Sequence, residues 1–311
     1  MVEISNKDIL NKKISSFNTT FNSNKNRNKI LYITDFDYTI TRKYDYSTGE
    51  KFHSTYSIYN QEVFGGNQSL YLAKDKEMAE YYGKYEEDTS FDFETRKNKS
   101  FEWYYLSLLN MSNEKLKPDS FKKMVELVIE HIKFRNDFKI LFETLIKNDI
   151  PIVVISGGIK EIIIEILRVL KIEGFEDYLK NKRIIIIANY LLDDNEKLVN
   201  WEERKEDIIY PFNKDIIIKK NLEKYFDGFE KIIIVGDLIT DYQSIDKINI
   251  DKKENVLSFG FLEYNPAKIK SDFDFKTDDT FKEYLNIFDV VFIKDQGYKS
   301  IIDSINKIIS K

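Results

Sequence analysis

Residues 29–40 read KILYITDFDYTI, an unbroken apolar run that ends in two carboxylates, Asp35 and Asp37, with Thr39 after them. Runs of Ile, Leu and Tyr are typical of a strand that is buried on both faces of a parallel α/β sheet. Ligands of such sheets bind just beyond the carboxyl ends of the strands. A D-x-D-x-T sequence at that edge provides one aspartate to attack a substrate or hold a metal, and a second to transfer protons. The alternative is that both aspartates only end the strand and cap the next turn, so the rest of the chain has to decide.

The remaining sequence alternates short β-branched runs with amphipathic segments. This alternation predicts an α/β fold with a doubly wound parallel sheet. An N-terminal helix is expected over residues 5–17 with a loop over 18–28, and residues 190–210 indicate a β-hairpin. The further predicted strands are 150–155, 183–188, 231–235, 256–261 and 290–293, and the predicted helices are 138–147, 159–171, 215–225 and 298–309.

The segment between about residues 43 and 135 differs in character, because Tyr, Glu and Lys dominate and the β-branched runs disappear. Amphipathic spacing predicts helices over residues 69–85, 97–110 and 119–132. Since this insert directly follows the first strand, we expect it to cover the active edge of the sheet. The predicted organisation is a core domain of residues 1–43 and 135–311 and a helical cap domain of residues 44–134.

Composition excludes several classes of function. The 311 residues are 42% hydrophobic and 32% charged, which is typical of a folded protein rather than a disordered one. A net charge of -5 leaves no basic surface for a nucleic acid polymer or an anionic membrane, and no apolar run reaches the roughly 18 residues of a membrane span. Cysteine is absent, which excludes disulfides, thiol nucleophiles and thiolate-zinc sites. Residues 1–28 lack the apolar core of a signal peptide, so we expect a cytoplasmic protein.

Two further groups stand at predicted boundaries between a strand or loop and a helix. Ser156-Gly157-Gly158 ends a strand and opens a helix, where a hydroxyl and backbone N–H groups can bind an oxyanion or a phosphate. Lys214 introduces another helix, where a cation opposes the macrodipole and therefore suggests a bound anion. The alternatives are an ordinary Gly-rich turn and a solvated surface lysine.

A third group follows the apolar run over residues 231–235. Asp237 comes directly after Gly236, and Asp241 follows one helical turn later. Asp35 and Asp237 could together hold Mg²⁺, which prefers a few oxygen ligands and keeps waters and substrate phosphate. The alternatives are a helix cap for Asp237 and a surface charge for Asp241. Since all these groups fall at one edge of the predicted sheet, we favour a single catalytic site.

In this order, the groups resemble the four motifs of the haloacid dehalogenase (HAD) superfamily of aspartate-nucleophile phosphatases, and the insert resembles its C1-type cap. The chain from about residue 29 to the C-terminus more specifically resembles cytosolic 5′-nucleotidase III, the pyrimidine 5′-nucleotidase family. The resemblance implies a HAD-like Rossmannoid core with a helical cap. The matching segments are 34–41 (TDFDYTIT), 101–104 (FEWY), 154–158 (VISGG), 212–215 (FNKD) and 288–295 (FDVVFIKD).

The resemblance implies a Mg²⁺-dependent 5′-nucleotidase that hydrolyses nucleoside 5′-monophosphates, pyrimidine nucleotides in particular, to nucleoside and phosphate. Asp35 would be the nucleophile that forms an aspartyl-phosphate, and Asp37 would be the general acid and base. Ser156, Gly157 and Lys214 would bind the phosphate. The expected partner is a nucleoside monophosphate, and the protein is expected to be a monomer.

For the metal, the resemblance implies that Mg²⁺ lies between Asp35, the backbone carbonyl of Asp37 and Asp237. Asp241 would orient waters or the catalytic lysine without binding the metal directly. One departure falls here, because the family usually has Gly-Asp-Ser and this chain has Leu238 in the place of the serine. A hydroxyl near the metal is therefore missing.

In the cap, the resemblance implies that Glu86 contacts the nucleobase together with Ser107. The assignment of the glutamate could move by one residue to Glu87. The cysteine-bearing segment often seen early in the cap reads FHSTY over residues 52–56 here, which leaves the base specificity open. The family usually has Ser-Ala-Gly where this chain has Gly157 in the middle, and we expect little cost because backbone N–H groups bind the phosphate.

Two alternatives to the nucleotidase hypothesis stay open. The cap could accept another small phosphomonoester, such as 7-methyl-GMP or phosphoserine. Outside enzymes, the chain could be a catalytically silent nucleotide-binding module. The preferred base and any phosphate transfer to a second nucleoside do not follow from the sequence.

Overall fold

Strand β2 (Ile30–Thr34) lies near the middle of a sheet with the strand order β1-β7-β6-β5-β2-β3-β4. The computed structural model describes residues 2–23, 29–52, 54–56, 69–88, 90–112, 117–225, 228–266, 269, 274–294 and 296–310. From β4 across to β7 the strands run parallel, as predicted, whereas the unpredicted edge strand β1 (Val2–Ile4) pairs antiparallel with β7. The other strands are β3 (Ile152–Ile159), β4 (Ile184–Asn189), β5 (Lys231–Gly236), β6 (Val256–Leu262) and β7 (Val290–Ile293).

The side chains of β2 explain its central place. All five of its residues are buried, with Ile30 and Tyr32 in the hydrophobic cluster on one face of the sheet and Leu31 and Ile33 in the cluster on the other. This alternation buries a continuously apolar strand on both faces, as the sequence predicted. Because β2 lies between β5 and β3 in parallel register, the carboxyl ends of these three strands meet at one edge of the sheet.

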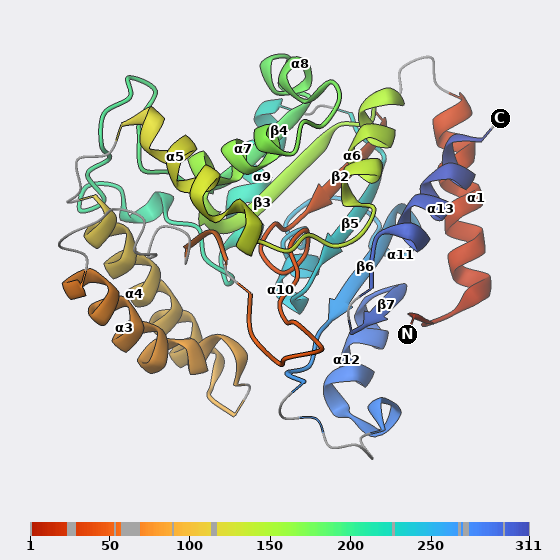
Figure 1. Cartoon of the computed structure of the whole chain (residues 1–311). Helices are drawn as coiled ribbons and strands as arrows, with labels where there is room; N and C mark the ends of the chain where they lie inside the picture. The colour runs from red at the N-terminus through yellow and green to blue at the C-terminus, as the bar shows by residue number, and fades with distance from the viewer. Residues whose placement is uncertain are drawn as a thin grey trace.

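Helices cover both faces of the sheet (Figure 1). α1 (Lys7–Ser23), α6, α7 and α13 contribute to the cluster that contains Tyr32, and α9 contributes to the cluster that contains Leu31. None of the helices in the described part of the chain combines the length and the apolar character of a membrane-spanning segment. The remaining core helices are α6 (Phe138–Lys147), α7 (Lys160–Val169), α8 (Phe175–Lys180), α9 (Lys214–Tyr225), α10 (Ile239–Gln243), α11 (Lys252–Asn255), α12 (Asp279–Ile287) and α13 (Lys299–Ile309).

Helix α1 is longer than the sequence predicted. The loop expected over residues 18–28 is helical as far as Ser23, and residues 24–28 lie outside the described part. Phe17 and Phe21 are buried one turn apart, and the Asn18 side chain donates to three carbonyl oxygens at the end of α13, which lies beside α1 (Figure 1). Tertiary contacts therefore hold a helix through a sequence that is locally too polar to predict one.

The insert after β2 contains an antiparallel helix pair, α3 (Ser69–Glu87) and α4 (Phe93–Met111), which lies to one side of the sheet (Figure 1). The third predicted helix forms α5 (Pro118–Val128), followed by the short 3₁₀ helix η3 (Ile129–His131). The buried side chains of α5 belong to the same hydrophobic cluster as α7, so α5 packs with the core. The hairpin predicted over residues 190–210 is reduced to the single bridge Leu192↔Leu198 and the 3₁₀ helix η4 (Lys205–Asp207), and the Asp193 carboxylate closes a tight turn between the bridged residues.

Candidate active site

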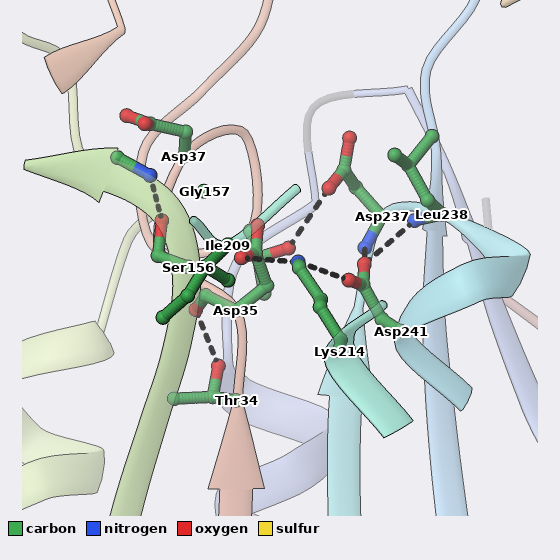
Figure 2. A network of polar contacts seen from close by, with 12 residues as sticks. Thr34, Asp35, Asp37, Ser156, Gly157, Ile209, Lys214, Asp237, Leu238 and Asp241 are labelled. Carbon is green, nitrogen blue, oxygen red and sulfur yellow. Dashed lines mark hydrogen bonds and ion pairs between the residues drawn. The ribbon is translucent and has the colours of Figure 1, made fainter. Parts of the chain in front are cut away.

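Asp35 follows the last residue of β2, and its carboxyl group is buried at the edge of the sheet. Its backbone N–H still donates to Val235 O of β5 (3.1 Å), which keeps the residue in the register of the sheet. Lys214 Nζ, from the first residue of α9, lies 2.9 Å from Asp35 Oδ1 (Figure 2). The lysine at the start of α9 therefore pairs with a carboxylate, and that carboxylate belongs to Asp35, the predicted nucleophile.

Asp241 on α10 is the second partner of Lys214. Its Oδ1 lies 2.7 Å from Lys214 Nζ, and its Oδ2 accepts the backbone N–H groups of Asp237 (3.0 Å) and Leu238 (2.9 Å). A Cβ on Gly236 would lie only 2.3 Å from Asp241 Cβ, so the glycine leaves the space that this carboxylate needs. Asp241 thus orients both the lysine and the turn after β5.

The turn after β5 carries Asp237, whose carboxylate is held by the loop after β2. Thr39 Oγ1 donates to Asp237 Oδ1 (3.2 Å), and the buried Tyr284 hydroxyl donates to the Asp237 carbonyl oxygen (2.5 Å). Leu238 lacks a hydroxyl, but Thr39 places one beside the same carboxylate. The departure from Gly-Asp-Ser therefore does not leave Asp237 without a hydroxyl partner.

The charge balance of this cluster fits a divalent cation. Carboxylate oxygens of Asp35, Asp237 and Asp241 all lie within 4.8 Å of one another. Burial raises the pKa of Asp35 well above its ordinary value despite Lys214, and burial together with Asp241 also raises the pKa of Asp237. Burial alone would lower the pKa of Lys214, but the carboxylates of Asp241 and Asp35 outweigh it and raise that pKa. Burial and the neighbouring carboxylates thus disfavour the ionised forms of Asp35 and Asp237, which a bound divalent cation would favour, and oxygen ligands of this kind suit Mg²⁺.

Asp37 is not part of this cluster through its side chain. Its carboxylate points away from Lys214 and Asp241 (Figure 2) and binds Thr55, whose N–H donates to Oδ1 (2.8 Å) and whose hydroxyl donates to Oδ2 (2.6 Å). Burial raises the pKa of Asp37 to about 6, and the hydrogen bonds from Thr55 oppose this rise. Sequence reasoning treated segment 52–56 only as a departure from the family and missed this contact. Within that segment, His53 lies outside the described residues.

Ser156, Gly157 and Gly158, here called segment 156–158, lie beside Asp37. The prediction that they end a strand and open a helix is wrong in detail, because β3 continues to Ile159 across an irregularity in its pairing with β4, and α7 begins only after it. Ser156 is buried, and its Oγ accepts the N–H of Gly158 (3.0 Å). A Cβ on Gly157 would lie 2.8 Å from the ring of Tyr104 on α4. The glycine at this position therefore matches a close contact with the insert.

The predicted residues meet in one pocket, and Asp241 lies behind Lys214 outside its lining. Glu86 of α3 and Ser107 of α4 line the pocket from the insert, and Glu86 Oε1 accepts a hydrogen bond from Ser100 (3.2 Å). The side chain of Glu87 lies outside the described part, so the choice between the two glutamates stays a prediction. From the core the pocket is lined by Asp35, Asp37, Ser156, Gly157, Lys214 and Asp237, and from the insert also by Trp103 and Tyr104.

Comparison with known families decides the class of protein. A sequence model of the pyrimidine 5′-nucleotidase (UMPH-1) family matches residues 38–310. The chain belongs to this family. It is therefore a member of a family of phosphoric monoester hydrolases, and the predicted resemblance is confirmed.

Individual relatives of this family member are distant in sequence. The chain is 24% identical to 7-methylguanosine phosphate-specific 5′-nucleotidase A of Xenopus laevis, over 90% of this chain and 87% of the relative. It is 25% identical to the 7-methylguanosine phosphate-specific 5′-nucleotidase of Homo sapiens, over 86% and 81%. The crystal structure of cytosolic 5′-nucleotidase IIIB bound to cytidine matches with a TM-score of 0.74 over 99% of this chain and 93% of that one, at 18% identity. This likeness confirms the predicted HAD-like α/β fold.

For this nucleotidase-family chain, the sequence predicted which core residues meet at the site. It did not predict the side chains that contact and hold them. Thr55, Tyr104 and Tyr284 reach the site from elements that are separate in sequence from the residues they contact. No spacing rule connects them to those residues. The one available signal was the unusual glycine in segment 156–158, which indicated that some other side chain occupies the space of a methyl group.

Proposed function

We propose that the protein is a Mg²⁺-dependent 5′-nucleotidase that hydrolyses nucleoside 5′-monophosphates to nucleoside and phosphate. The observation that carries the proposal is the pairing of Asp35 with Lys214 in a pocket that Glu86 and Ser107 also line from the insert. The core supplies a nucleophile and a cation for the phosphoryl group. The insert supplies polar groups and aromatic rings that can contact a nucleobase. If Asp35 only ended the strand and capped the next turn, there would be no reason for a buried lysine to pair with it.

The proposed chemistry uses two displacements at phosphorus. In the first, a carboxylate oxygen of Asp35 forms a bond to phosphorus, the bond from phosphorus to the 5′-oxygen breaks, and Asp37 gives its proton to the leaving oxygen. In the second, water attacks the aspartyl-phosphate, Asp37 takes a proton from that water, and the carboxylate of Asp35 is released with inorganic phosphate. Ser156, the backbone N–H of Gly157 and Lys214 bind the phosphate oxygens throughout.

Asp35, Asp237 and the backbone carbonyl of Asp37 would hold Mg²⁺ in this proposal. The close approach of the carboxylates of Asp35, Asp237 and Asp241 supports this assignment. When bound, the ion supplies positive charge that offsets the repulsion between an anionic nucleophile and an anionic substrate. Asp241 contributes by fixing Lys214 between itself and Asp35.

Two classes of base are candidates for the pocket. Pyrimidine nucleotides are supported by the family match and by the structural neighbour that holds cytidine. 7-Methyl-GMP is favoured by the Glu86 carboxylate, which shares the pocket with Trp103 and Tyr104. A 7-methylated guanine carries a positive charge, which aromatic faces and a carboxylate both stabilise. The frog and human homologues are named for this substrate.

We further propose that residues 44–134 act as the cap domain over the core of residues 1–43 and 135–311, with α3 and α4 as the part that closes over the nucleotide. The packing of α5 with α7 suggests that the end of this range stays fixed to the core during closure. We also propose a cytoplasmic location, since the structural neighbour is a cytosolic 5′-nucleotidase. A monomeric state is part of the same proposal.

The test is phosphate release from CMP, UMP, AMP, GMP, 7-methyl-GMP and phosphoserine with Mg²⁺ or with EDTA. Wild type is compared with Asp35→Asn, which keeps the shape of the nucleophile and removes its charge. We expect turnover of at least one nucleotide that requires Mg²⁺ and disappears in the variant. Turnover of phosphoserine alone would keep the chemistry and refute the base assignment, whereas a folded wild type without any turnover would favour the silent binding module.

A further inference from the structure

Thr55 is almost fully buried, and both of its hydrogen-bond donors, the backbone N–H and the hydroxyl, bind the carboxylate of Asp37. The N–H donates to Oδ1 at 2.8 Å and the hydroxyl to Oδ2 at 2.6 Å. Among the described residues, these two are the hydrogen bonds that the structure gives to this carboxylate. A single hydrogen bond lets a carboxylate turn about its own bond, but two from one residue fix both its position and the plane of its oxygens.

The contact depends on a glycine in segment 156–158. A Cβ on Gly158 would lie 2.1 Å from Thr55 Oγ1 and 3.0 Å from Asp37 Oδ2, so the threonine hydroxyl occupies the space beside bare backbone. The next residue, Tyr56, packs edge to face on Tyr104 with ring centroids 5.4 Å apart, and Tyr104 in turn covers Gly157. Thr55 therefore reaches Asp37 because the start of the insert, here called the linker (residues 44–52 and 54–56), lies against segment 156–158.

We propose that Thr55 is a positioning residue that holds Asp37 in the orientation needed for proton transfer, and that this orientation lasts only while the linker is seated on segment 156–158. The inference rests on the proposed function, since it assumes that Asp37 moves a proton. A hydroxyl is suited to this task because it can donate to a carboxylate and accept from a carboxylic acid, so the contact survives both halves of the reaction. Valine has nearly the same shape and can do neither.

The variant that tests this is Thr55→Val, with Thr55→Ser to restore the hydroxyl. Thr48→Val is the matched control, because it makes the same change at an exposed position of the same linker. The substrates are the preferred nucleotide, whose alkoxide leaving group needs a proton, and p-nitrophenyl phosphate, whose leaving group does not. The measurements are kcat and KM for the nucleotide, and the stopped-flow burst of p-nitrophenolate, which reports the first displacement alone.

For the nucleotide we expect Thr55→Val to lower kcat about 10- to 100-fold, less than complete loss of a general acid would. KM should stay within about threefold, because Thr55 is not among the residues that line the pocket. The p-nitrophenolate burst should keep its rate within about twofold, while the steady-state rate that follows it falls, since the second displacement again needs Asp37. Thr55→Ser should recover most of the nucleotide kcat, and Thr48→Val should match wild type.

Three outcomes would overturn the inference while leaving the proposed function intact: a wild-type kcat in Thr55→Val, an increase in that kcat, or an equal loss of the nucleotide rate and the burst rate. An equal loss would show general damage to the site rather than a misplaced Asp37. Failure of the serine variant to recover activity while it binds the nucleotide normally would also count against the inference. The proposed function fails separately, and the inference with it, if wild type itself hydrolyses none of these esters.

Discussion

The substitution Gly157→Ala tests how tightly α4 closes on segment 156–158. The added Cβ would lie 2.8 Å from both Cε1 and the hydroxyl oxygen of Tyr104, a distance at which non-bonded atoms overlap. Gly157 lies within β3, and its carbonyl oxygen accepts a hydrogen bond from the Asn189 side chain (2.7 Å), so we expect Tyr104 and α4 to move instead. Overpacking of this kind costs about 1–3 kcal/mol. If the cost falls on the closed, substrate-bound pocket, kcat/KM should drop about 5- to 150-fold.

The assay combines steady-state kinetics on the preferred nucleotide with urea unfolding. Gly83→Ala in α3 is the matched control, because its Cβ would meet Trp103 at an ordinary 3.9 Å. This control should keep its activity and gain up to about 1 kcal/mol of stability, as alanine is favoured over glycine inside a helix. Tyr104→Leu removes the clashing ring, so the double variant with Gly157→Ala should show a coupling energy of about 1 kcal/mol or more.

Two results together would refute this reasoning: wild-type kcat/KM in Gly157→Ala, and no coupling between that change and Tyr104→Leu. They would mean that α4 does not approach segment 156–158 in the working enzyme. We expected that Gly157, at the position where the family usually has alanine, would cost the enzyme little activity. That expectation would then hold because no side chain occupies the space beside Gly157.

Three other perturbations follow from the contacts of the site and the core. Lys214→Met leaves the buried carboxylates of Asp35 and Asp241 without their cation, so phosphate release should fall at least ~10²-fold and urea unfolding should show a loss of about 3–5 kcal/mol. Saturating Mg²⁺ should raise the free energy of unfolding of wild type, by about 2.7 kcal/mol at 100 times its Kd, but change that of Asp237→Asn much less; equal shifts would argue against Asp237 as a ligand. Asn18→Ala should cost about 1–2 kcal/mol of stability, because α13 loses three hydrogen bonds to its last carbonyls, while turnover is unchanged.

Much of the fold followed from local pattern. The continuously apolar runs predicted the parallel strands, and helix α6 matched its prediction residue for residue, because its apolar spacing matches one buried helical face. Short elements were missed: β1 and α8 carry too few residues for a periodic signal to form. The end of α1 was missed for a different reason, since Asn18 is a poor helix residue that finds its partners only on α13.

The carboxylates of the proposed site and Lys214 could be placed at one edge of the sheet from the sequence alone, because parallel strands bring their carboxyl ends to one edge and a short motif follows each end. The supports of that site could not. Thr55 against Asp37 and Tyr104 against Gly157 join the linker and a helix of the insert to the sheet, and each contact exists only because a glycine leaves a gap of the right size. Such gaps are properties of packing in three dimensions. Chain order determines which residues arrive at the edge of the sheet, and packing determines which of them touch.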